Sequence, residues 1–453
     1  MKIPRVMISA ASSGSGKTMI TCGILQALVN RKMKVASFKC GPDYIDPMFH
    51  ESAIGTRSRN LDMFFTDVAI TKYLFGRAAK DCDISVTEGV MGFYDGLGGG
   101  STDASSYDLS CKLDMPVILL VDCKGSSVSI VALIKGFSEF RKNNIKGVIL
   151  NNMPEKLYPS IKEMIENELD LKVIGYVPNV KDIVIESRHL GLLLPNEIDG
   201  MKDRLNKLAD ILEKTLDIDS IIRLADSAPN LDYNEPDIPY DGVSVKIGVA
   251  FDECFCFMYK DNIELLERLG AKIVYFSPVN DKKMPEGIGG MILPGGYPEL
   301  FAKKLSENRT MLNDIRKRIG EGMPCMAECG GFMYLHDELE DPSGKYHKMV
   351  GVIDGKAFRT ENLSRFGYMT ITSRTDGILA KGSEIKGHEF HYWDSTNCGD
   401  DCEAVKTSGM RYDCMHNTGS IAAGFPHLYY YSDPGTAHEF LLRCASYLDR
   451  VRE

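Results

Sequence analysis

The sequence predicts an α/β protein built from two doubly wound domains. Short apolar runs that are typical of buried strands alternate with segments of helical periodicity over the first 195 residues or so, and the same alternation begins again at residue 245. A chain of 453 residues is also too long for one ordinary hydrophobic core. Alternation of this kind predicts a parallel sheet covered by helices on both faces in each domain.

The first strand is predicted at residues 5–9 and leads into a helix with one apolar face. That face carries Ile20, Ile24, Leu25 and Leu28. The other predicted strands are 84–87, 117–121, 147–150 and 173–176 in the first domain, and 245–250, 273–276 and 291–293 in the second.

The domain boundary is predicted in a polar segment that contains Pro229, Pro236 and Pro239. A helical stretch near residues 200–226 precedes it. We therefore expect three parts along the chain. They are a first domain at 1–195, a helical segment with a linker at 196–243 and a second domain at 244–453.

The composition excludes several classes of partner. A formal net charge of -10 disfavours nucleic acid and anionic membrane surfaces, because both attract basic patches. No apolar run approaches the roughly 18 residues that a membrane span needs, and no secretory signal is visible, so we expect a cytoplasmic protein. The 13 cysteines show no spacing typical of zinc sites, so we expect no structural metal.

A phosphate-binding loop lies between the first strand and the first helix. Residues 11–18 read A-S-S-G-S-G-K-T, a Walker A loop with alanine in place of its first glycine. Small residues let consecutive backbone N–H groups surround phosphate oxygens, the lysine reaches the outer phosphates and the threonine can bind Mg²⁺. The expected nucleotide contacts are Ser13, Gly14, Ser15, Gly16, Lys17 and Thr18.

Acidic residues near the ends of the predicted strands are candidates for metal and substrate binding. Glu88 follows the strand at 84–87, where a carboxylate beside a phosphate-binding loop is well placed to hold a metal. Its alternative is a solvated glutamate in a loop. Asp43 and Asp46 lie in a G-P-D-Y-I-D-P stretch and could equally be ordinary turn carboxylates.

A candidate nucleophile, Cys329, lies in the second domain. A short apolar strand runs into A-E-C-G-G and then into a predicted helix, an arrangement typical of a nucleophile elbow. We expect the thiol to be exposed, with its pKa lowered by the helix N-terminus. The alternative is a buried cysteine beside a glycine turn.

Two further features could complete a cysteine site. Gly295 and Gly296 follow a strand and could offer N–H donors to an oxyanion. A general base could be His427, about a hundred residues downstream, and His388 and His391 are rivals that the residues alone do not exclude.

These motifs together, in this order and over nearly the whole chain, resemble the cobyrinic acid a,c-diamide synthase family. The first half is similar to P-loop ATPases related to dethiobiotin synthetase, and the second half to class I glutamine amidotransferases with a flavodoxin-like sheet. The stretches that carry the resemblance are 12–18, 41–47, 88–92 with 94–96, 188–192, 295–300, 327–331 and 387–392.

The resemblance implies roles for individual residues. Cys329 would be the nucleophile and His427 its base. ATP would bind the phosphate-binding loop, with Asn151 near the adenine and Mg²⁺ held by Thr18 and Glu88. The residues implied near the substrate or a phosphorylated intermediate are Asp43, Tyr44, Ile45, Asp46 and Asp95.

The sequence also departs from the family pattern. Most class I amidotransferases carry a glutamate two residues after the catalytic histidine, where this chain has Tyr429, so the third member of the triad is unassigned. Pro426 and Trp393 also differ from most relatives. We interpret His388, Glu389 and His391 as structural or interface residues.

The expected reaction is the ATP- and glutamine-dependent amidation of the c and a acetates of cobyrinic acid through an acyl phosphate. The expected partners are cobyrinic acid and L-glutamine, and a homodimer is left open. Nickel sirohydrochlorin and hydrogenobyrinic acid are alternative substrates of the same chemistry, and cobyric acid synthase is a weaker alternative. A nucleotide-switch ATPase of the partitioning type is the alternative from a different class.

Overall fold

The computed structural model describes residues 1–180, 187–188, 191–192, 200–239 and 242–452. The chain divides into two compact units, unit 1 (Met1–Pro236) and unit 2 (Asp237–Glu453). Each unit is described by itself. The stretch 188–192, one of those that carry the family resemblance, lies partly outside the described residues, which include only the strands β8 (Ser187–Arg188) and β9 (Gly191–Leu192) there.

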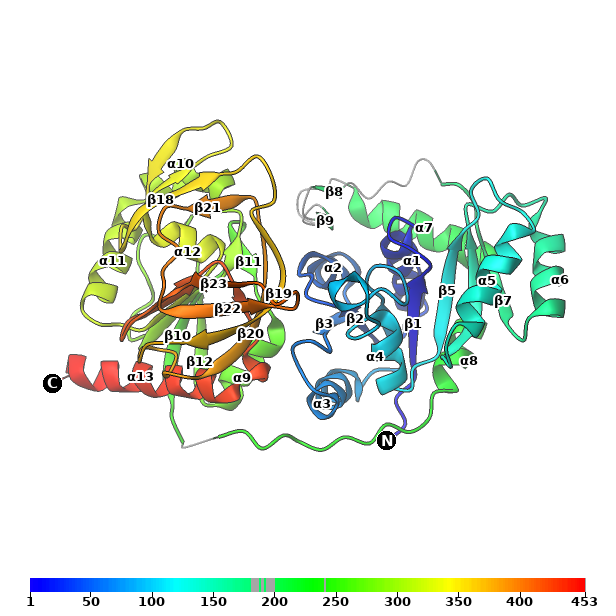
Figure 1. Ribbon diagram of the computed structural model, residues 1–453, viewed down its shortest axis with the longest axis horizontal. Helices are drawn as coiled ribbons and strands as arrows, with labels where there is room; N and C mark the ends of the chain where they lie inside the picture. The colour runs from blue at the N-terminus through cyan, green and yellow to red at the C-terminus, as the bar shows by residue number, and fades with distance from the viewer. Residues whose placement is uncertain (181–186, 189–190, 193–199, 240–241, 453) are drawn as a thin grey trace. The chain divides into compact units, whose positions relative to one another are not determined.

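Unit 1 is built on a seven-stranded parallel sheet in the order β3-β2-β4-β1-β5-β6-β7 (Figure 1). The central strands are almost wholly buried because helices cover both faces, which explains their apolar sequences. The strands are β1 (Arg5–Ala10), β2 (Val35–Cys40), β3 (Arg57–Leu61), β4 (Ile84–Glu88), β5 (Val117–Asp122), β6 (Ile145–Asn151) and β7 (Lys172–Val177).

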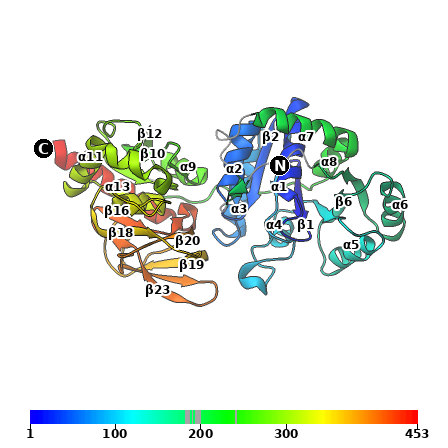
Figure 2. The same ribbon diagram turned by 90° about the horizontal axis from the view of Figure 1, so that it is seen from above.

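Helices α1, α7 and α8 cover one face of this sheet, and α4 and α5 lie on the other (Figure 2). The contact of α1 with α7 is close at Gly23, where a Cβ would come within 2.5 Å of Leu212 Cδ1. The helices of unit 1 are α1 (Lys17–Asn30), α2 (Ile45–Phe49), α3 (Val68–Ala79), α4 (Ser106–Lys112), α5 (Ser129–Glu139), α6 (Tyr158–Glu168), α7 (Met201–Thr215) and α8 (Ile218–Asp226), with the short turns η1 (His50–Ile54) and η2 (Leu97–Gly99).

The helical segment that precedes the predicted linker packs on the sheet of unit 1. Leu205, Leu208 and Leu212 of α7 are buried in the same core as Ile20 and Ile24 of α1. Helix α8 adds Ile218, Ile221 and Ala225 to that core. This packing places α7 and α8 within unit 1.

Unit 2 contains a six-stranded sheet in the order β12-β10-β13-β15-β25-β24, parallel except for β24. Its strands are β10 (Val245–Ala250), β12 (Ala271–Phe276), β13 (Gly290–Leu293), β15 (Cys325–Glu328), β24 (His416–Asn417) and β25 (Ile421–Gly424). The helices and turns are α9 (Lys260–Arg268), α10 (Ala302–Glu307), α11 (Arg309–Gly320), α12 (Gly330–Leu335), α13 (Pro434–Arg452), η4 (Pro298–Phe301) and η5 (Tyr430–Ser432).

Smaller sheets complete unit 2. A five-stranded antiparallel sheet has the order β23-β22-β19-β20-β26, a four-stranded sheet has the order β17-β16-β18-β21, and β11 pairs with β14. Their strands are β11 (Phe255–Phe257), β14 (Gly295–Gly296), β16 (His336–Glu340), β17 (Tyr346–Lys348), β18 (Ile353–Arg359), β19 (Arg365–Ser373), β20 (Glu384–His391), β21 (Trp393–Ser395), β22 (Cys402–Lys406), β23 (Arg411–Cys414) and β26 (His427–Leu428).

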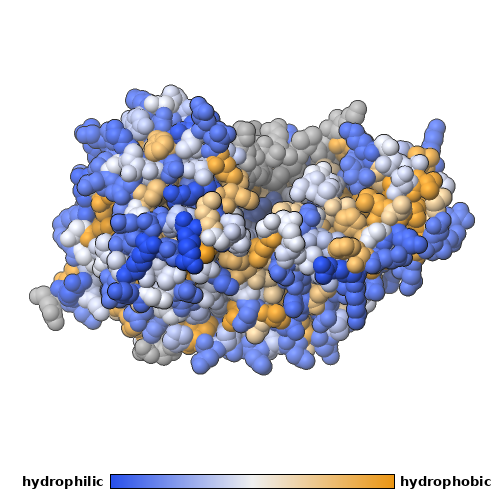
Figure 3. Space-filling model, in the orientation of Figure 1, coloured by the Kyte–Doolittle hydropathy of each residue, from blue (hydrophilic) through white to orange (hydrophobic). Residues whose placement is uncertain are grey.

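The predicted α/β class with two doubly wound domains is confirmed, and the antiparallel sheets of unit 2 were not predicted. Apolar side chains remain exposed on unit 1 at Val128, Leu133 and Phe140, on or beside α5, where orange atoms gather in Figure 3. No helix in the described part of the chain is long and apolar enough to span a bilayer.

Candidate active sites of the two units

The phosphate-binding loop of unit 1 connects β1 to α1 and is shaped by two glycines. Gly14 and Gly16 have φ of 77° and 86°, in the left-handed region that side chains disfavour. A Cβ on Gly16 would lie 2.7 Å from Asn151 Nδ2, so Asn151 also leaves no room for a side chain at this position. The loop therefore has the open curl of backbone N–H groups that a phosphate requires.

Asn151, at the end of β6, lies against this loop. Its side chain donates a hydrogen bond of 2.8 Å to the carbonyl of Ser15, and it is buried. The Ser15 hydroxyl in turn donates to the carbonyl of Ser12 at 2.9 Å. The first bond ties the loop to the end of β6, and the second lies within the loop itself. The adenine contact expected for Asn151 stays a prediction.

Lys17 begins α1 and donates to the carbonyl of Met91, a residue in the loop after β4 with φ of 43°. Burial, and then the nearby charge of Lys39, lower the pKa of Lys17 to about 8. A phosphate at this place would bring the negative charge that offsets both effects.

Glu88 lies at the centre of a buried polar cluster at the carboxyl ends of β1, β2 and β4. It is 0% exposed, and Oε1 accepts a hydrogen bond of 2.6 Å from the Thr18 hydroxyl. The predicted alternative, a solvated loop glutamate, is wrong. Thr18 and Glu88 bring two hard oxygen donors together, and such a pair suits Mg²⁺, which takes its remaining ligands from phosphate and water.

Lys39, a buried residue of β2 that the sequence did not single out, links the acidic residues of this cluster. Its Nζ lies 2.8 Å from Glu88 Oε1 and also forms an ion pair with Asp46. Burial acts to lower the pKa of Lys39, but the two carboxylates raise it well above its usual value. His50 Nε2 lies 3.5 Å from Glu88 Oε2 and is wholly buried.

The G-P-D-Y-I-D-P stretch folds over the same end of the sheet. Asp43 Oδ1 accepts a hydrogen bond from the Ile45 N–H at 2.8 Å, as a turn carboxylate does, while burial and then Asp46 raise its pKa to about 8. Burial acts to raise the pKa of Asp46, but Lys39 holds it below its usual value. Tyr44 and Ile45 are buried beside them.

Asp95 has a local contact in the loop after β4. Its Oδ2 accepts a hydrogen bond of 3.0 Å from the Gly92 N–H. The contact stabilises the turn at residues 92–95, which follows the carbonyl of Met91 that holds Lys17.

In unit 2 the backbone at Cys329 has the conformation of a nucleophile elbow. Its φ of 47° and ψ of -103° are strained for a residue with a side chain, and it joins β15 directly to α12. Its N–H donates to the Gly424 carbonyl at 2.8 Å. The next two positions are closed to side chains, because a Cβ on Gly330 would meet Pro298 Cδ at 2.9 Å and one on Gly331 would overlap the Leu293 carbonyl.

The expectation of an exposed thiol with a lowered pKa is wrong. Cys329 is 6% exposed, and burial, followed by the charge of Glu299, raises the pKa of its thiol, although the Gly330 N–H opposes that shift. Because the thiol form is favoured, the site needs a base that removes the proton as the sulfur attacks.

His427 lies next to the glycines after β13. A Cβ on Gly295 would overlap the His427 ring, and a Cβ on Gly330 would lie 3.0 Å from the Gly296 nitrogen. The glycines, the elbow and His427 therefore form one cluster. Burial lowers the pKa of His427 to about 3, so its imidazole is neutral and able to accept a proton.

The two rival histidines lie on β20. His388 pairs with His427 across the β20–β26 ladder. His391 stacks on Phe425, with ring centroids 3.9 Å apart, and its Nδ1 contacts the Trp393 carbonyl at 2.5 Å. The contact with Gly295 therefore favours His427 over His388 and His391 as the base.

Glu328, which immediately precedes Cys329, is a second residue that the sequence did not single out. Its Oε2 lies 3.8 Å from His427 Nδ1, and its Oε1 accepts a hydrogen bond of 3.4 Å from the Tyr430 hydroxyl. Burial raises the pKa of Glu328 to about 8, while the Leu428 N–H, which donates to the carboxylate, opposes that shift. Tyr429, at the position of the usual triad glutamate, donates to Asp261 at 3.1 Å instead.

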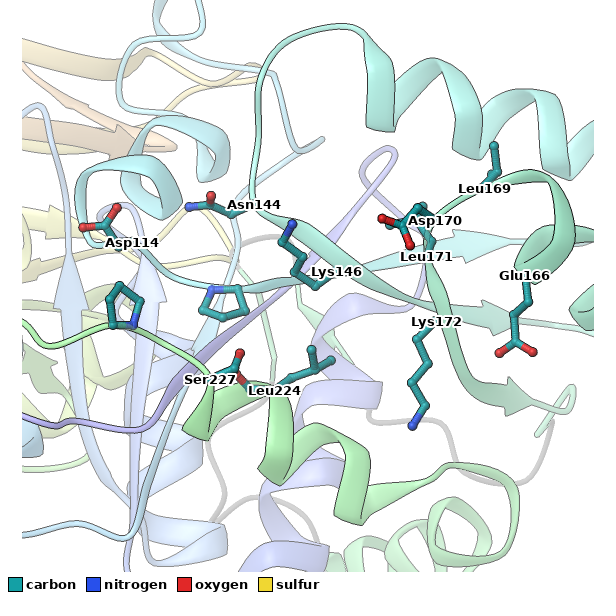
Figure 4. Close-up of a pocket in the computed structure, with 12 residues that line it drawn as sticks. Asp114, Asn144, Lys146, Glu166, Leu169, Asp170, Leu171, Lys172, Leu224 and Ser227 are labelled. Carbon is teal, nitrogen blue, oxygen red and sulfur yellow. The ribbon is translucent and has the colours of Figure 1, made fainter.

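A cavity of about 750 Å³ lies elsewhere in unit 1 (Figure 4). Its walls come from the segments that precede β5, β6 and β7, including Asp114 and Asn144, and from Lys146 of β6 and Leu224 of α8. This is the amino edge of the sheet, opposite to the edge that carries the phosphate-binding loop. The cavity is therefore separate from the cluster around Glu88.

Two family models match the chain. Residues 6–192 match the CobQ/CobB/MinD/ParA nucleotide binding domain, and residues 246–434 match the CobB/CobQ-like glutamine amidotransferase domain. The cobyrinate a,c-diamide synthase of Caldanaerobacter subterraneus subsp. tengcongensis is 38% identical over 97% of this chain and 98% of its own length. The synthase of Picrophilus torridus is 38% identical over 98% and 99%.

The chain belongs to the cobyrinate a,c-diamide synthase family.

Membership of the cobyrinate a,c-diamide synthase family confirms the resemblance and makes the chain an enzyme. It is a glutamine-hydrolysing carbon–nitrogen ligase of cobalamin biosynthesis, with an ATP-binding domain and an amidotransferase domain. The alternative of a nucleotide-switch protein is therefore wrong.

Proposed function

We propose that this enzyme converts the c and a acetates of cobyrinic acid to amides, using ATP in unit 1 and ammonia cut from glutamine in unit 2. The observation that carries the proposal is the cysteine cluster of unit 2, in a chain whose other unit holds a phosphate-binding loop beside a buried acidic cluster. Cys329 has the strained backbone of a nucleophile elbow, and His427, which lies against Gly295 in the same cluster, is neutral.

In unit 2 the Cys329 sulfur attacks the side-chain amide carbon of glutamine. His427 takes the thiol proton and gives it to the leaving nitrogen, so that ammonia departs and a glutamyl thioester remains. Water then attacks the thioester carbon, which releases glutamate and restores the thiol. The N–H groups of Gly295 and Gly296 stabilise the oxyanion. Glu328, whose Oε2 lies 3.8 Å from His427 Nδ1, orients the imidazole in place of the glutamate that Tyr429 replaces.

In unit 1 a substrate carboxylate oxygen attacks the γ-phosphorus of ATP, and the bond to ADP breaks. The acyl phosphate makes the carbon reactive toward ammonia, whose nitrogen forms the amide bond as phosphate leaves. Lys17 and Lys39 offset the charge on the transferred phosphoryl group. The G-P-D-Y-I-D-P stretch and Asp95 lie beside the corrinoid or the intermediate.

Thr18 and Glu88 are the residues that would hold Mg²⁺. Their oxygen atoms lie 2.6 Å apart, and a magnesium ion bound there neutralises charge on the phosphates. Glu88 also contacts Lys39, so the same carboxylate organises both positive groups of the site.

The test is mass spectrometry of cobyrinic acid after incubation with the enzyme, ATP, Mg²⁺ and glutamine, with ADP and glutamate measured alongside. The proposal expects two successive acid-to-amide mass shifts, each matched by one ADP and one glutamate. Glutamate without a change in the corrinoid would contradict the substrate and leave nickel sirohydrochlorin and hydrogenobyrinic acid to be tried. A corrinoid amidated without glutamate production would contradict the role of unit 2.

A further inference from the structure

Helix α9 holds the segment after His427 through one asparagine, which the sequence did not single out. Asn262 lies in the first turn of α9 and is 4% exposed. Its Nδ2 donates a hydrogen bond of 2.8 Å to the Leu428 carbonyl, and its Oδ1 accepts one of 2.8 Å from the Tyr430 N–H. A side-chain amide has one donor end and one acceptor end. Both ends of Asn262 therefore bind backbone groups, on the two sides of Tyr429.

Leu428 presents its backbone groups to Asn262 because they point away from β20. Strand β26 is the last strand of the five-stranded sheet and pairs with β20. The Tyr429 N–H donates to the Lys386 carbonyl of β20 at 3.0 Å. In an antiparallel pair the backbone groups of successive residues alternate between the two sides of a strand, so those of Leu428 face the opposite side. On that side Asn262 binds the carbonyl and the Glu328 carboxylate accepts from the N–H.

Leu428 thereby connects Asn262 to the cysteine site. Leu428 directly follows His427, and Glu328, which binds the Leu428 N–H, has its Oε2 3.8 Å from His427 Nδ1. The Tyr430 hydroxyl donates to Oε1 of the same carboxylate at 3.4 Å. These two donors to Glu328 belong to the two residues whose backbone Asn262 holds. A displacement of this backbone would therefore move Glu328 and the imidazole relative to each other.

The residue before Asn262 binds a side chain of the same segment. The Tyr429 hydroxyl donates to Asp261 Oδ2 at 3.1 Å. The Tyr429 ring also packs edge-on against the Tyr259 ring, with centroids 5.1 Å apart. Pro426, which precedes His427, has no N–H to contribute to a sheet. The start of α9 thus holds both the backbone and a side chain of residues 428–430.

We propose that Asn262 is a positioning residue of the glutaminase site, which acts through Glu328 and keeps His427 in the geometry that proton transfer requires. Small displacements of catalytic groups cost rate even when the cause lies outside the reacting atoms. The loss of Asn262 is therefore expected to lower kcat for glutamine hydrolysis and to leave KM for glutamine nearly unchanged. This assignment deepens the proposed glutaminase function and rests on it.

The test measures kcat and KM for glutamate release from glutamine at a pH above about 8, where the Glu328 carboxylate is charged. Asn262→Leu keeps the side-chain volume and removes both hydrogen bonds. Asn262→Ala removes the same bonds and leaves room for water to bind the freed backbone groups, so it serves where the leucine variant does not fold. Asn308→Ala is the matched control, because Asn308 also binds backbone of unit 2, donating to the Pro278 and Asp281 carbonyls at 2.9 and 2.8 Å.

Both Asn262 variants are expected to lower kcat by about 10- to 100-fold and to change KM by less than about threefold. Asn308→Ala is expected to keep the wild-type kcat. A wild-type kcat in Asn262→Leu would show that the residue only fills space. That result, or equal losses of kcat in Asn262→Ala and Asn308→Ala, would overturn the assignment.

A double variant provides a readout that a merely structural role would not move. Because Asn262 acts through Glu328, Asn262→Ala combined with Glu328→Gln should be about as slow as Glu328→Gln alone. Losses that multiply would place the effect of Asn262 elsewhere and contradict the assignment. A wild-type enzyme that releases no glutamate from glutamine would instead overturn the proposed function itself.

Discussion

Glu328 Oε2 lies 3.8 Å from Nδ1 of His427, and both side chains are buried. The carboxylate belongs to the residue immediately before the nucleophile, so the turn at Cys329 also fixes the position of Glu328. The Leu428 N–H and the Tyr430 hydroxyl donate to the same carboxylate from the segment that follows His427. The segment that carries the base is thus held to the strand that carries the nucleophile.

At a pH above about 8, where the Glu328 carboxylate is charged, replacing Glu328 by glutamine is expected to lower glutamine-dependent kcat by about 100-fold, because the imidazole loses the charge that orients and stabilises its protonated form. Steady-state rates of glutamate release measure the effect. Glu338→Gln, which removes a surface ion pair with Lys356, is the control and should behave as the wild type. A Glu328→Gln enzyme of normal kcat would contradict the orienting role.

The pH dependence of glutamate release follows from the same pair. Burial raises the pKa of Glu328 to about 8, so the carboxylate is protonated below that pH and charged above it. His427 is neutral in both ranges, because its pKa is lowered to about 3. We expect kcat/KM for glutamine to increase as the pH rises through about 8 in the wild type, and this step to be absent in Glu328→Gln. An identical step in both proteins would assign it to another group.

Lys39→Met is expected to destabilise the protein by about 3 kcal/mol, because it leaves two buried carboxylates without their cation. Chemical denaturation measures this change. Adding Glu88→Gln to Lys39→Met should recover part of the loss, since one of the unpaired charges is then removed. Additive losses in the double variant would show that Lys39 and Glu88 are not coupled. ATP-dependent amidation with ammonium salts should also be lost in Lys39→Met.

Gly295→Ala is expected to reduce glutamine hydrolysis by about 100-fold. The new methyl group would overlap the His427 ring and push the imidazole out of its position. Amidation supported by ammonium salts should continue in this variant, because the ATP site lies in unit 1. Gly419→Ala is the matched control, as a Cβ there meets nothing within 4 Å. Equal activity of the two variants with glutamine would contradict the placement of His427.

The parts of the fold that local patterns encode were predictable from the sequence. Strand β1 is a continuous apolar run before a Walker A loop, and both are found where they were expected. Strand β2 was missed because Ser37 and Lys39 interrupt its apolar pattern. Lys39 is buried only because Asp46 and Glu88 pair with it, and the contact with Glu88, 49 residues away, leaves no local signal.

The site in unit 2 shows the same limit. Cys329 and the two glycines after it form a local motif that predicts the turn. The burial of the thiol, however, depends on segments far along the chain, including Gly424. Glu328 was visible only as a neighbour of the cysteine, since its contact with His427 spans about a hundred residues. Glu389 alternates with half-buried residues along β20 as many strand residues do, and only the antiparallel partner β19 shows what lies beside it.

The central claim is that Cys329 cuts from glutamine the nitrogen that unit 1 attaches to the corrinoid. The most direct test incubates the enzyme with cobyrinic acid, ATP, Mg²⁺ and glutamine labelled with ¹⁵N in its side-chain amide, and measures the product by mass spectrometry. We expect both new amides to carry the label in the wild type, and no amidation by Cys329→Ser until ammonium salts are added. Labelled product from Cys329→Ser, or equal loss of amidation with glutamine and with ammonium, would contradict the account.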